Sequence, residues 1–306
     1  MGKIERALMY VLAAALAVSL VITFAWGLLE RGEDVSSISV IVHDEDDAQW
    51  KKFKMGMDQA ASEYNAEVNF VTLYDRNDVG QQMELIEREV SNGAQAIILS
   101  PAGDEELALA LEKAPPSAPL ILIGGGLESE IINREISADQ EAMGYSLGMA
   151  MKEDGIENCV VYTGNGTQSF ITDRLSGMRK AFREAGISYT VTGEQPETYF
   201  WRGIQAVVAL DDTLTAELCA DGMFWYYEKK VYGFGSSDQL LKYLDEGELE
   251  LLMFVNSYDE GYLSLQAAVQ EIQKEGKSQD EALEYYKIKR ERIYQKNYQR
   301  LLFPSS

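Results

Sequence analysis

The chain has 306 residues, 46% of them hydrophobic, and 50 acidic against 27 basic side chains give it a net charge of −23. This length and apolar share allow more than one domain, each with a buried core. The acidic balance excludes nucleic acid as a partner, because phosphate contacts need clustered Lys and Arg. It argues equally against docking on an anionic lipid surface.

The first feature in chain order is an uncharged apolar run, Ala7–Leu29. At about 1.5 Å of helical rise per residue, this run can cross a hydrocarbon layer of about 30 Å. Lys3 and Arg6 precede the run, and three acidic residues follow it by residue 34. Because positive charge stays in the cytoplasm, we expect the rest of the chain to lie outside the cell. The run is either a retained membrane anchor, which its length favours, or a signal peptide cleaved near Ala25–Gly27.

Residues from 35 onward alternate short apolar runs, which predict strands, with apolar residues at helical spacing, which predict helices. The predicted strands are Ile38–Val42, Val68–Leu73, Ala96–Leu99, Leu120–Ile123, Cys159–Tyr162, Ile187–Val191, Gln205–Leu210, Val231–Phe234 and Leu249–Val255. Continuous apolar runs of this kind are typical of parallel strands that helices cover on both faces. The pattern restarts after Ile123, so we expect an α/β fold of two doubly wound parallel-sheet lobes with a hinge and a central cleft.

Two segments depart from this pattern. The link between the strands predicted at Ile187–Val191 and Gln205–Leu210 has no helical period, although a parallel crossover normally contains a helix. The link is therefore either a bare loop or the place where a helix common to such folds is missing. In the tail, the alternation Tyr286-Lys287-Ile288-Lys289-Arg290 predicts an exposed strand.

The sequence gives no sign of catalysis or of a metal. Cys159 and Cys219 lie in apolar or helical patterns and are expected to be buried free thiols. The chain has no CxxC, HExxH or Cys/His cluster, and no nucleophile–base pair or phosphate loop stands out. We therefore expect no cofactor, no metal and no enzyme activity.

Several short motifs occur in a characteristic order between residues 38 and 276. They are Asp75-x-x-Asp78-x-x-x-Gln82, Gly93–Pro101, Ile136–Asp139, Gly144-Tyr145-x-x-Gly148, Tyr162–Asn165, Arg174-x-x-Gly177, Val208–Asp212, Val231–Phe234 and Gly247 leading to Gly261-Tyr262. In this order the chain resembles the type I periplasmic binding proteins, in particular the ribose- and galactose-type sugar receptors of ABC importers. The resemblance implies a membrane anchor or signal peptide at 1–34, a first lobe at 35–138 plus 257–276, and a second lobe at 139–256 plus 277–306.

In that family a monosaccharide binds between the lobes through stacked rings and paired hydrogen bonds. Carried over residue by residue, the resemblance implies ligand contacts at Asp46, Trp50, Asp139, Arg174, Tyr199, Asp211 and Asn256. Asp139 is alternatively a hinge residue, and Trp50 lies on an apolar helical stripe that also fits a core position. Arg174 begins a helix, a poor place for a cation, which favours a functional or interlobe role.

The chain departs from the sugar receptors where they often carry polar clamp groups. Gly124 and Gly125 replace an Asp-Arg pair, and Gly235 replaces an Asp. The ligand is therefore expected either to be larger, filling the space that the glycines leave, or to differ from a simple pentose or hexose.

The resemblance leaves three functions open. The leading one is a monomeric extracytoplasmic protein that closes on a small polar ligand, expected to be a carbohydrate, and presents it to the membrane permease of an ABC importer. A retained anchor at Ala7–Leu29 favours a sensor that serves a kinase or chemoreceptor instead. The glycines at 124–126 and 235 favour a degenerate member whose cleft no longer binds.

Overall fold

The computed structural model describes residues 35–43, 47–75, 77–127, 129–164, 168–196, 203–220, 228–274 and 281–303, together with Gly2 and Ser19. Within this part of the chain, no helix is both long enough and apolar enough to cross a bilayer. The predicted segment Ala7–Leu29 lies outside the described residues except for Ser19, so the anchor stays a prediction.

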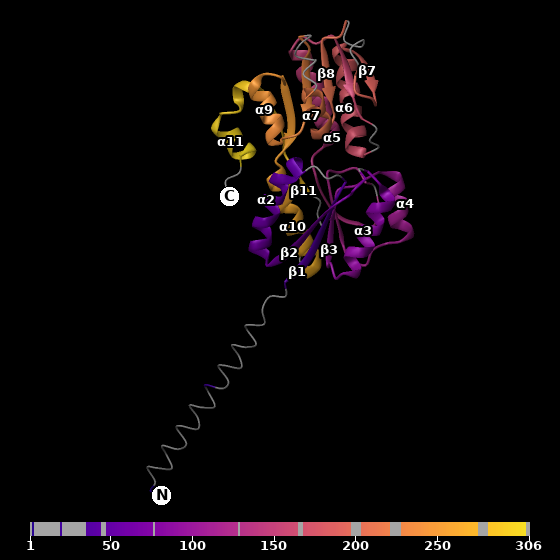
Figure 1. Ribbon diagram of the computed structural model, residues 1–306, viewed down its shortest axis with the longest axis vertical. Coiled ribbons are helices and arrows are strands. Elements are labelled where there is room, and N and C mark those ends of the chain that lie inside the picture. The colour runs from indigo at the N-terminus through magenta and orange to yellow at the C-terminus, as the bar shows by residue number, and fades with distance from the viewer. Residues whose placement is uncertain are drawn as a thin grey trace. The chain divides into compact units, whose positions relative to one another are not determined.

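The first lobe is built on a six-stranded sheet with the order β11-β5-β4-β3-β1-β2 (Figure 1). Its strands are β1 (Ser36–Val42), β2 (Ala66–Thr72), β3 (Ala96–Leu99), β4 (Leu120–Ile123), β5 (Ile132–Ser137) and β11 (Glu281–Ala282). Its helices are α2 (Asp47–Tyr64), α3 (Val79–Ser91), α4 (Glu105–Lys113) and α10 (Ser257–Gln273). The pairs β1–β3, β3–β4, β4–β5 and β5–β11 are all parallel.

The second lobe has a six-stranded sheet of its own, with the order β12-β10-β9-β8-β6-β7. Its strands are β6 (Asn158–Tyr162), β7 (Ser188–Thr192), β8 (Ala206–Ala209), β9 (Lys230–Phe234), β10 (Leu251–Val255) and β12 (Tyr285–Ile288). Its helices are α5 (Gln140–Glu153), α6 (Ser169–Ala185), α7 (Asp212–Ala220), α9 (Asp238–Glu246) and α11 (Lys296–Leu302), with a short 3₁₀ turn, η2 (Arg290–Arg292). Only the edge strand β12 runs antiparallel, against β10.

Each sheet is buried on both faces because successive strand residues point to opposite sides. In β1, Val40 and Val42 pack with α2 and α10, whereas Ile41 packs with α3 and α4. In β6, Val161 packs with α5 and α6, whereas Val160 packs with α7 and α9. This double burial explains why the strands read as unbroken apolar runs.

In each lobe, two helices on one face of the sheet approach until backbone meets backbone. A Cβ at Gly56 of α2 would lie 1.9 Å from the Tyr258 carbonyl oxygen of α10, and one at Gly261 would lie 2.1 Å from that of Phe53. Helices α5 and α6 meet in the same way, since a Cβ at Gly177 would lie 1.9 Å from the Glu141 oxygen. Glycine is therefore required at these contacts.

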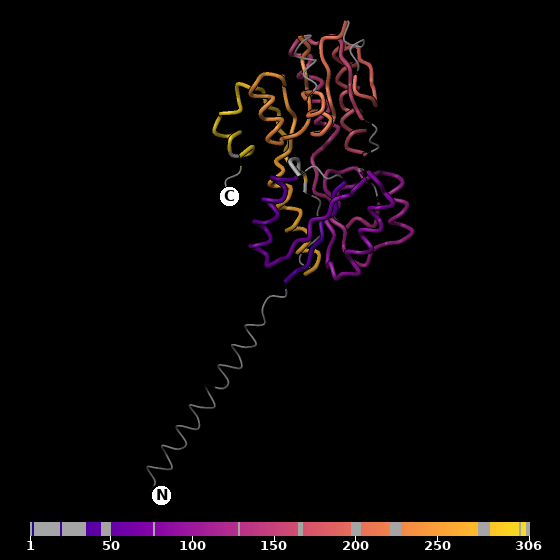
Figure 2. The backbone as a smooth tube through the Cα atoms, viewed as in Figure 1, coloured from indigo at the N-terminus to yellow at the C-terminus, as the bar shows by residue number. Residues whose placement is uncertain are grey.

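The chain passes between the two sheets three times, after β5, after β10 and between β11 and β12 (Figure 2). The first two crossings are followed at once by helices, which Asp139 and Asn256 cap at their N-termini. Strand β11 lies within the range expected for the second lobe, yet it pairs with β5 of the first sheet. The other lobe limits stay a prediction.

The nine predicted strands are confirmed with boundaries shifted by two residues or fewer, and the tail strand is β12. Sequence reasoning missed β5, because Asn133, Arg134 and Glu135 interrupt its apolar residues. The Arg134 side chain is buried and donates to Gln270 Oε1 at 2.7 Å. Between β7 and β8, the described residues 193–196 and 203–205 contain no helix.

Both cysteines are buried free thiols, as predicted. Burial raises the pKa of Cys159 and of Cys219 to about 12. Neither thiol ionises near neutral pH, so neither is reactive.

Candidate ligand-binding cleft

A cavity of about 120 Å³ lies between the lobes at the carboxyl ends of the central strands. His43, Ser100 and Gly124 follow β1, β3 and β4, and Asp211 and Gly235 follow β8 and β9. This edge of parallel sheets is where ligands bind in such folds. The cavity is smaller than the about 300–1,000 Å³ usual for ligand pockets, which argues against the larger ligand that the glycines suggested.

Arg174 is the only lysine or arginine in the described lining of the cavity. Its Nε donates to Gln140 Oε1 at 2.8 Å and its Nη1 donates to the Leu210 carbonyl oxygen at 2.6 Å. The guanidinium carbon lies 5.0 Å from the ring centre of Phe170 and 4.5 Å from that of Phe234. The aromatic rings thus hold the guanidinium by cation–π contact.

The charge of Arg174 survives its burial. Burial lowers the pKa of Arg174 to about 10, and Asp211, Glu260 and Asp212 offset part of this decrease. The guanidinium therefore stays protonated at neutral pH. It presents a fixed positive charge, flanked by carboxylates, to whatever enters the cavity.

Glu260 faces this charge from α10 of the first lobe. Burial raises its pKa from the ordinary 4.5 to about 7, although Arg174 and the backbone N–H of Gly124 favour the ionised form. Glu260 is therefore an acid whose charge changes near neutral pH, a property found often at functional sites.

The raised pKa of Glu260 predicts a pH dependence of stability. A carboxyl group with a folded-state pKa above its unfolded value stabilises the fold below about pH 4.5, and this contribution is lost as the pH rises through about 7. We expect the melting temperature to fall between pH 5 and pH 8 by more in the wild type than in Glu260→Gln, as measured by calorimetry. Equal slopes in the two proteins would contradict this assignment.

Two adjacent acids, Asp211 and Asp212, shape the second lobe's side of the cavity. Asp211 Oδ1 accepts from the Leu214 N–H at 2.6 Å. The buried Asp212 accepts from the N–H of Ser236 and of Ser237 at 2.9 and 3.0 Å, and from Ser237 Oγ at 2.7 Å. Asp212 thereby fixes the loop between β9 and α9.

Asp212 also explains the glycine at 235. A Cβ there would lie 2.3 Å from Asp212 Oδ2, and the backbone φ is +129°. The carboxylate that the sugar receptors often carry after this strand is absent at Gly235, and the carboxylate of Asp212 fills the space beside it.

The glycines Gly124, Gly125 and Gly126 contribute backbone groups where a polar clamp was expected. All three have positive φ, between +80° and +90°, a region that favours glycine. The Gly124 N–H bonds to Glu260, and the Gly124 oxygen accepts from Gln140 Nε2 at 3.3 Å. The space beside Gly126 is filled by Ser169, whose Oγ lies 2.6 Å from the Gly126 oxygen.

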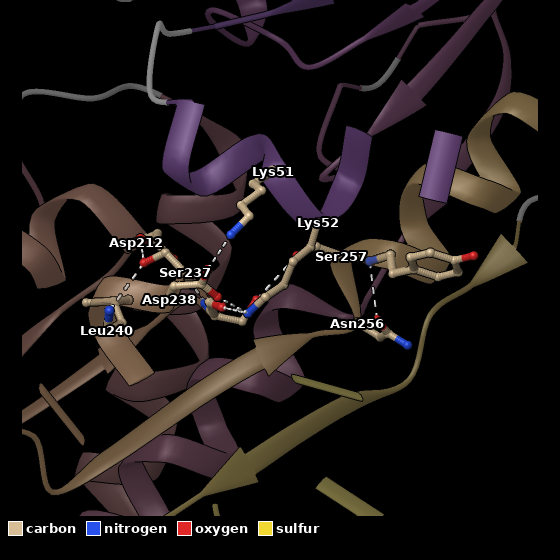
Figure 3. A network of polar contacts seen from close by, with 10 residues as sticks. Lys51, Lys52, Asp212, Ser237, Asp238, Leu240, Asn256 and Ser257 are labelled. Atoms are coloured by element: carbon tan, nitrogen blue, oxygen red, sulfur yellow. Dashed lines mark hydrogen bonds and ion pairs between the residues drawn. The ribbon is translucent and has the colours of Figure 1, made fainter. Parts of the chain in front are cut away.

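Direct polar contacts hold the lobes together on both sides of the cavity. On one side, Lys51 Nζ of α2 lies 2.7 Å from Asp238 Oδ2 at the start of α9, and Lys52 Nζ lies 3.4 Å from Asp238 Oδ1 (Figure 3). The buried Lys52 also donates to the Ser236 carbonyl oxygen. On the other side, Ser169 of α6 bonds to Asp104 of the first lobe. The structure is thus a closed form.

The cavity brings together three of the seven predicted site residues. Trp50, Arg174 and Asp211 line it. Trp50 is also buried in the core, with its ring 5.7 Å from that of His43, so its core alternative is confirmed. Whether these residues contact a ligand stays a prediction.

The other four predicted residues do not line the cavity in the described part of the chain. Asp139 is exposed and caps α5 by accepting from the Ala142 N–H at 2.8 Å. Asn256 caps α10 by accepting from the Tyr258 N–H at 3.2 Å. Asp46 and Tyr199 lie outside the described residues.

Sequence reasoning missed Gln140, Phe170 and Glu260. Each lies in the first turn of a helix that follows a predicted strand or crossing, and for Gln140 and Glu260 this is a place where polar residues are ordinary. Among the described residues, no group of three or more His, Cys, Asp or Glu side chains is placed to hold a metal ion.

Two lobes of parallel sheet that close over a cavity define an α/β binding protein. Residues 38–278 match the family described as "Periplasmic binding protein domain", and the chain belongs to this family. Its members form a class of extracytoplasmic binding proteins. A comparison with curated protein sequences gives no match.

Solved structures share the fold at low identity. A carbohydrate transporter solute-binding protein from Agrobacterium radiobacter, in complex with D-arabinose, is 18% identical with a TM-score of 0.79, covering 89% of this chain and 100% of its own. A solute-binding protein from Agrobacterium vitis with D-fucose is 16% identical with a TM-score of 0.78, covering 88% and 100%. A glucose-galactose binding protein from Geobacillus stearothermophilus is 15% identical with a TM-score of 0.76, covering 86% and 100%. At such identities the likeness shows the fold.

Proposed function

We propose that the chain is a monomeric solute-binding protein that closes on a small polar ligand outside the cytoplasm and presents it to the permease of an ABC importer. The observation that carries this proposal is the cavity between two α/β lobes, with Arg174 from one lobe and Glu260 from the other facing into it. Fixed charged groups in a cavity select ligands by their hydrogen-bonding pattern, because an unpaired buried polar group costs about 1–3 kcal/mol.

The ligand class is a monosaccharide or a cyclitol. The structures that share this fold hold D-arabinose, D-fucose, D-allose, α-D-tagatopyranose and myo-inositol, respectively. A small cavity lined by carboxylates, a guanidinium and aromatic rings suits vicinal hydroxyl groups on a compact ring. Lobe closure around such a ligand is a hinge motion of the kind common in binding proteins.

A thermal-shift screen of the full-length chain with these five compounds tests the proposal. A ligand present at about 100 times its Kd stabilises the folded state by about 2.7 kcal/mol, and we expect at least one compound to raise the melting temperature clearly. If none of them does, and a wider panel of small metabolites also fails, the chain is a family member whose cleft does not bind.

The predicted segment Ala7–Leu29 supports a second candidate, a membrane-tethered sensor. In that function the anchored chain presents its ligand to a kinase or chemoreceptor. Deletion of the gene for this protein distinguishes the importer function from the sensor function. Lost uptake with intact gene induction would reject the sensor, whereas intact uptake with lost induction would reject the importer.

A further inference from the structure

The carboxylate of Asp104 bonds to a helix of the opposite lobe. Asp104 occupies the N-cap position of α4, yet its side chain makes no cap hydrogen bond to α4. Instead, Asp104 Oδ1 accepts from the Ser169 N–H at 2.6 Å. Ser169 is the first residue of α6, and the residue before it, Gln168, makes no side-chain cap bond either. Asp104 therefore caps α6 across the cleft, which occurs only when the lobes are together.

This contact holds three oxygen atoms and one hydroxyl proton. Ser169 Oγ lies 2.7 Å from Asp104 Oδ1 and 2.6 Å from the Gly126 carbonyl oxygen. The serine hydroxyl has one proton to donate, and the carbonyl oxygen can only accept. If Asp104 is ionised, the single hydroxyl proton of Ser169 is either shared between these two short contacts or absent from one of them. If Asp104 is protonated, its carboxyl donates to Ser169 Oγ and Ser169 donates to Gly126.

We propose that closure of the lobes takes up a proton on Asp104, so that the Asp104–Ser169–Gly126 contact is a latch that acid strengthens. The inference rests on the proposed function, because it concerns the regulation of the same cleft. A binding protein with this latch holds its closed form more firmly at low pH and opens more readily as the pH rises.

The surroundings of Asp104 agree with a protonated carboxyl. Burial raises its pKa, and the two bonds from Ser169 lower it less. The other charged residues nearest in sequence on the elements in contact are Glu105 and Glu106 at the start of α4, and Asp173 and Arg174 in α6. Arg174 is bonded to Gln140 and Leu210, and the described loop Gly124–Leu127 carries no charge.

The test measures closure directly, without any ligand. Spin labels on the exposed positions Glu87→Cys and Arg183→Cys report the distance between the lobes of the full-length chain in detergent micelles. The native thiols stay unlabelled because they are buried and un-ionised. In Glu260→Gln, which removes the other acid of the cavity with a raised pKa, we expect the closed-to-open ratio to rise as the pH is lowered from 8 to 4, by up to about tenfold for each pH unit between the pKa values of Asp104 in the two forms.

Matched variants assign this response to Asp104. Asp104→Asn cannot take up a proton, so adding it to Glu260→Gln should abolish the response of the closed-to-open ratio to pH. Asp238→Asn, which weakens the contact with Lys51 on the other side of the cavity, should keep the full response. An unchanged response when Asp104→Asn is added to Glu260→Gln would overturn the proposal.

A second pair of variants tests the close approach itself. A Cβ at Gly126 would lie 2.1 Å from Ser169 Cβ, so Gly126→Ala should hold the lobes open at both pH values. Gly124→Ala has a similar φ, +80° against +90°, but its Cβ would meet nothing within 4 Å, and it should still close. Equal closure of these two variants would also overturn the latch.

The tests of the latch and of the proposed function are independent because no sugar is present in the spin-label experiment. A negative result for the latch leaves the proposed function standing, and a negative sugar screen leaves the latch standing.

Discussion

Arg174→Met is expected to lower the free energy of unfolding by about 3–5 kcal/mol at pH 8, because it leaves facing carboxylates without their cation. Glu260 and Asp211 both interact electrostatically with Arg174. At pH 5 Glu260 is protonated, since its pKa is about 7, so the loss should be smaller. Urea unfolding of the full-length chain at the two pH values measures the difference, and binding of any sugar found in the screen should be lost in parallel.

A matched control and a double variant sharpen this result. Arg179→Met removes an exposed arginine from the same helix, α6, and should change stability by no more than about 0.5 kcal/mol. Glu260→Gln combined with Arg174→Met should recover part of the loss, because the unpaired charge is gone. The assignment fails if the Arg174 and Arg179 variants lose the same stability, or if the second substitution recovers none of it.

Gly177→Ala is expected to destabilise the protein by about 3 kcal/mol, at the upper end of the usual cost of overpacking. Its Cβ would lie 1.9 Å from the Glu141 carbonyl oxygen, and this atom belongs to a helical backbone that cannot move alone. Helices α5 and α6 would have to separate, which also pulls Gln140 away from Arg174. A calorimetric scan should show the loss as a lower melting temperature.

Gly80→Ala is the control for this substitution. Gly80 lies in α3, and the nearest atom to its Cβ would be Asp78 Oδ1 at 3.3 Å, the end of a side chain. Alanine has the higher helix propensity, so this change should be neutral or stabilising by up to about 1 kcal/mol. If both variants melt at the same temperature, the close approach of α5 and α6 does not limit stability.

Most of the fold could be predicted from the sequence because a strand buried on both faces is an unbroken apolar run. Such a run can be recognised without knowing which strand it pairs with. Ala96–Leu99 and Leu120–Ile123 were predicted to the residue for this reason. Strand β5 lacked the signal, since its polar residues are satisfied by contacts such as Arg134 with Gln270 that only the fold brings together. The tail helix α11 packs on the second lobe through few apolar residues, such as Leu302, and was missed too.

The site was harder to predict because neighbouring residues on a helix point in directions about 100° apart. Asp139 and Gln140 are adjacent, yet the first caps α5 in solvent and the second lines the cavity. Asn256 and Glu260 are similarly divided at the start of α10. The resemblance identified the helical turns that border the cavity, but it could not show which side chain in each turn lines the cavity.

The glycine contacts between helices have a consequence for measurement. Gly261 follows Glu260 directly, and a Cβ at Gly144 would lie 2.0 Å from the Arg174 carbonyl oxygen. Arg174 and Glu260 therefore each lie on a pair of helices whose backbones are in direct contact. Neither helix can shift far within its own lobe, so the distance between positions 174 and 260 reports the hinge angle between the lobes.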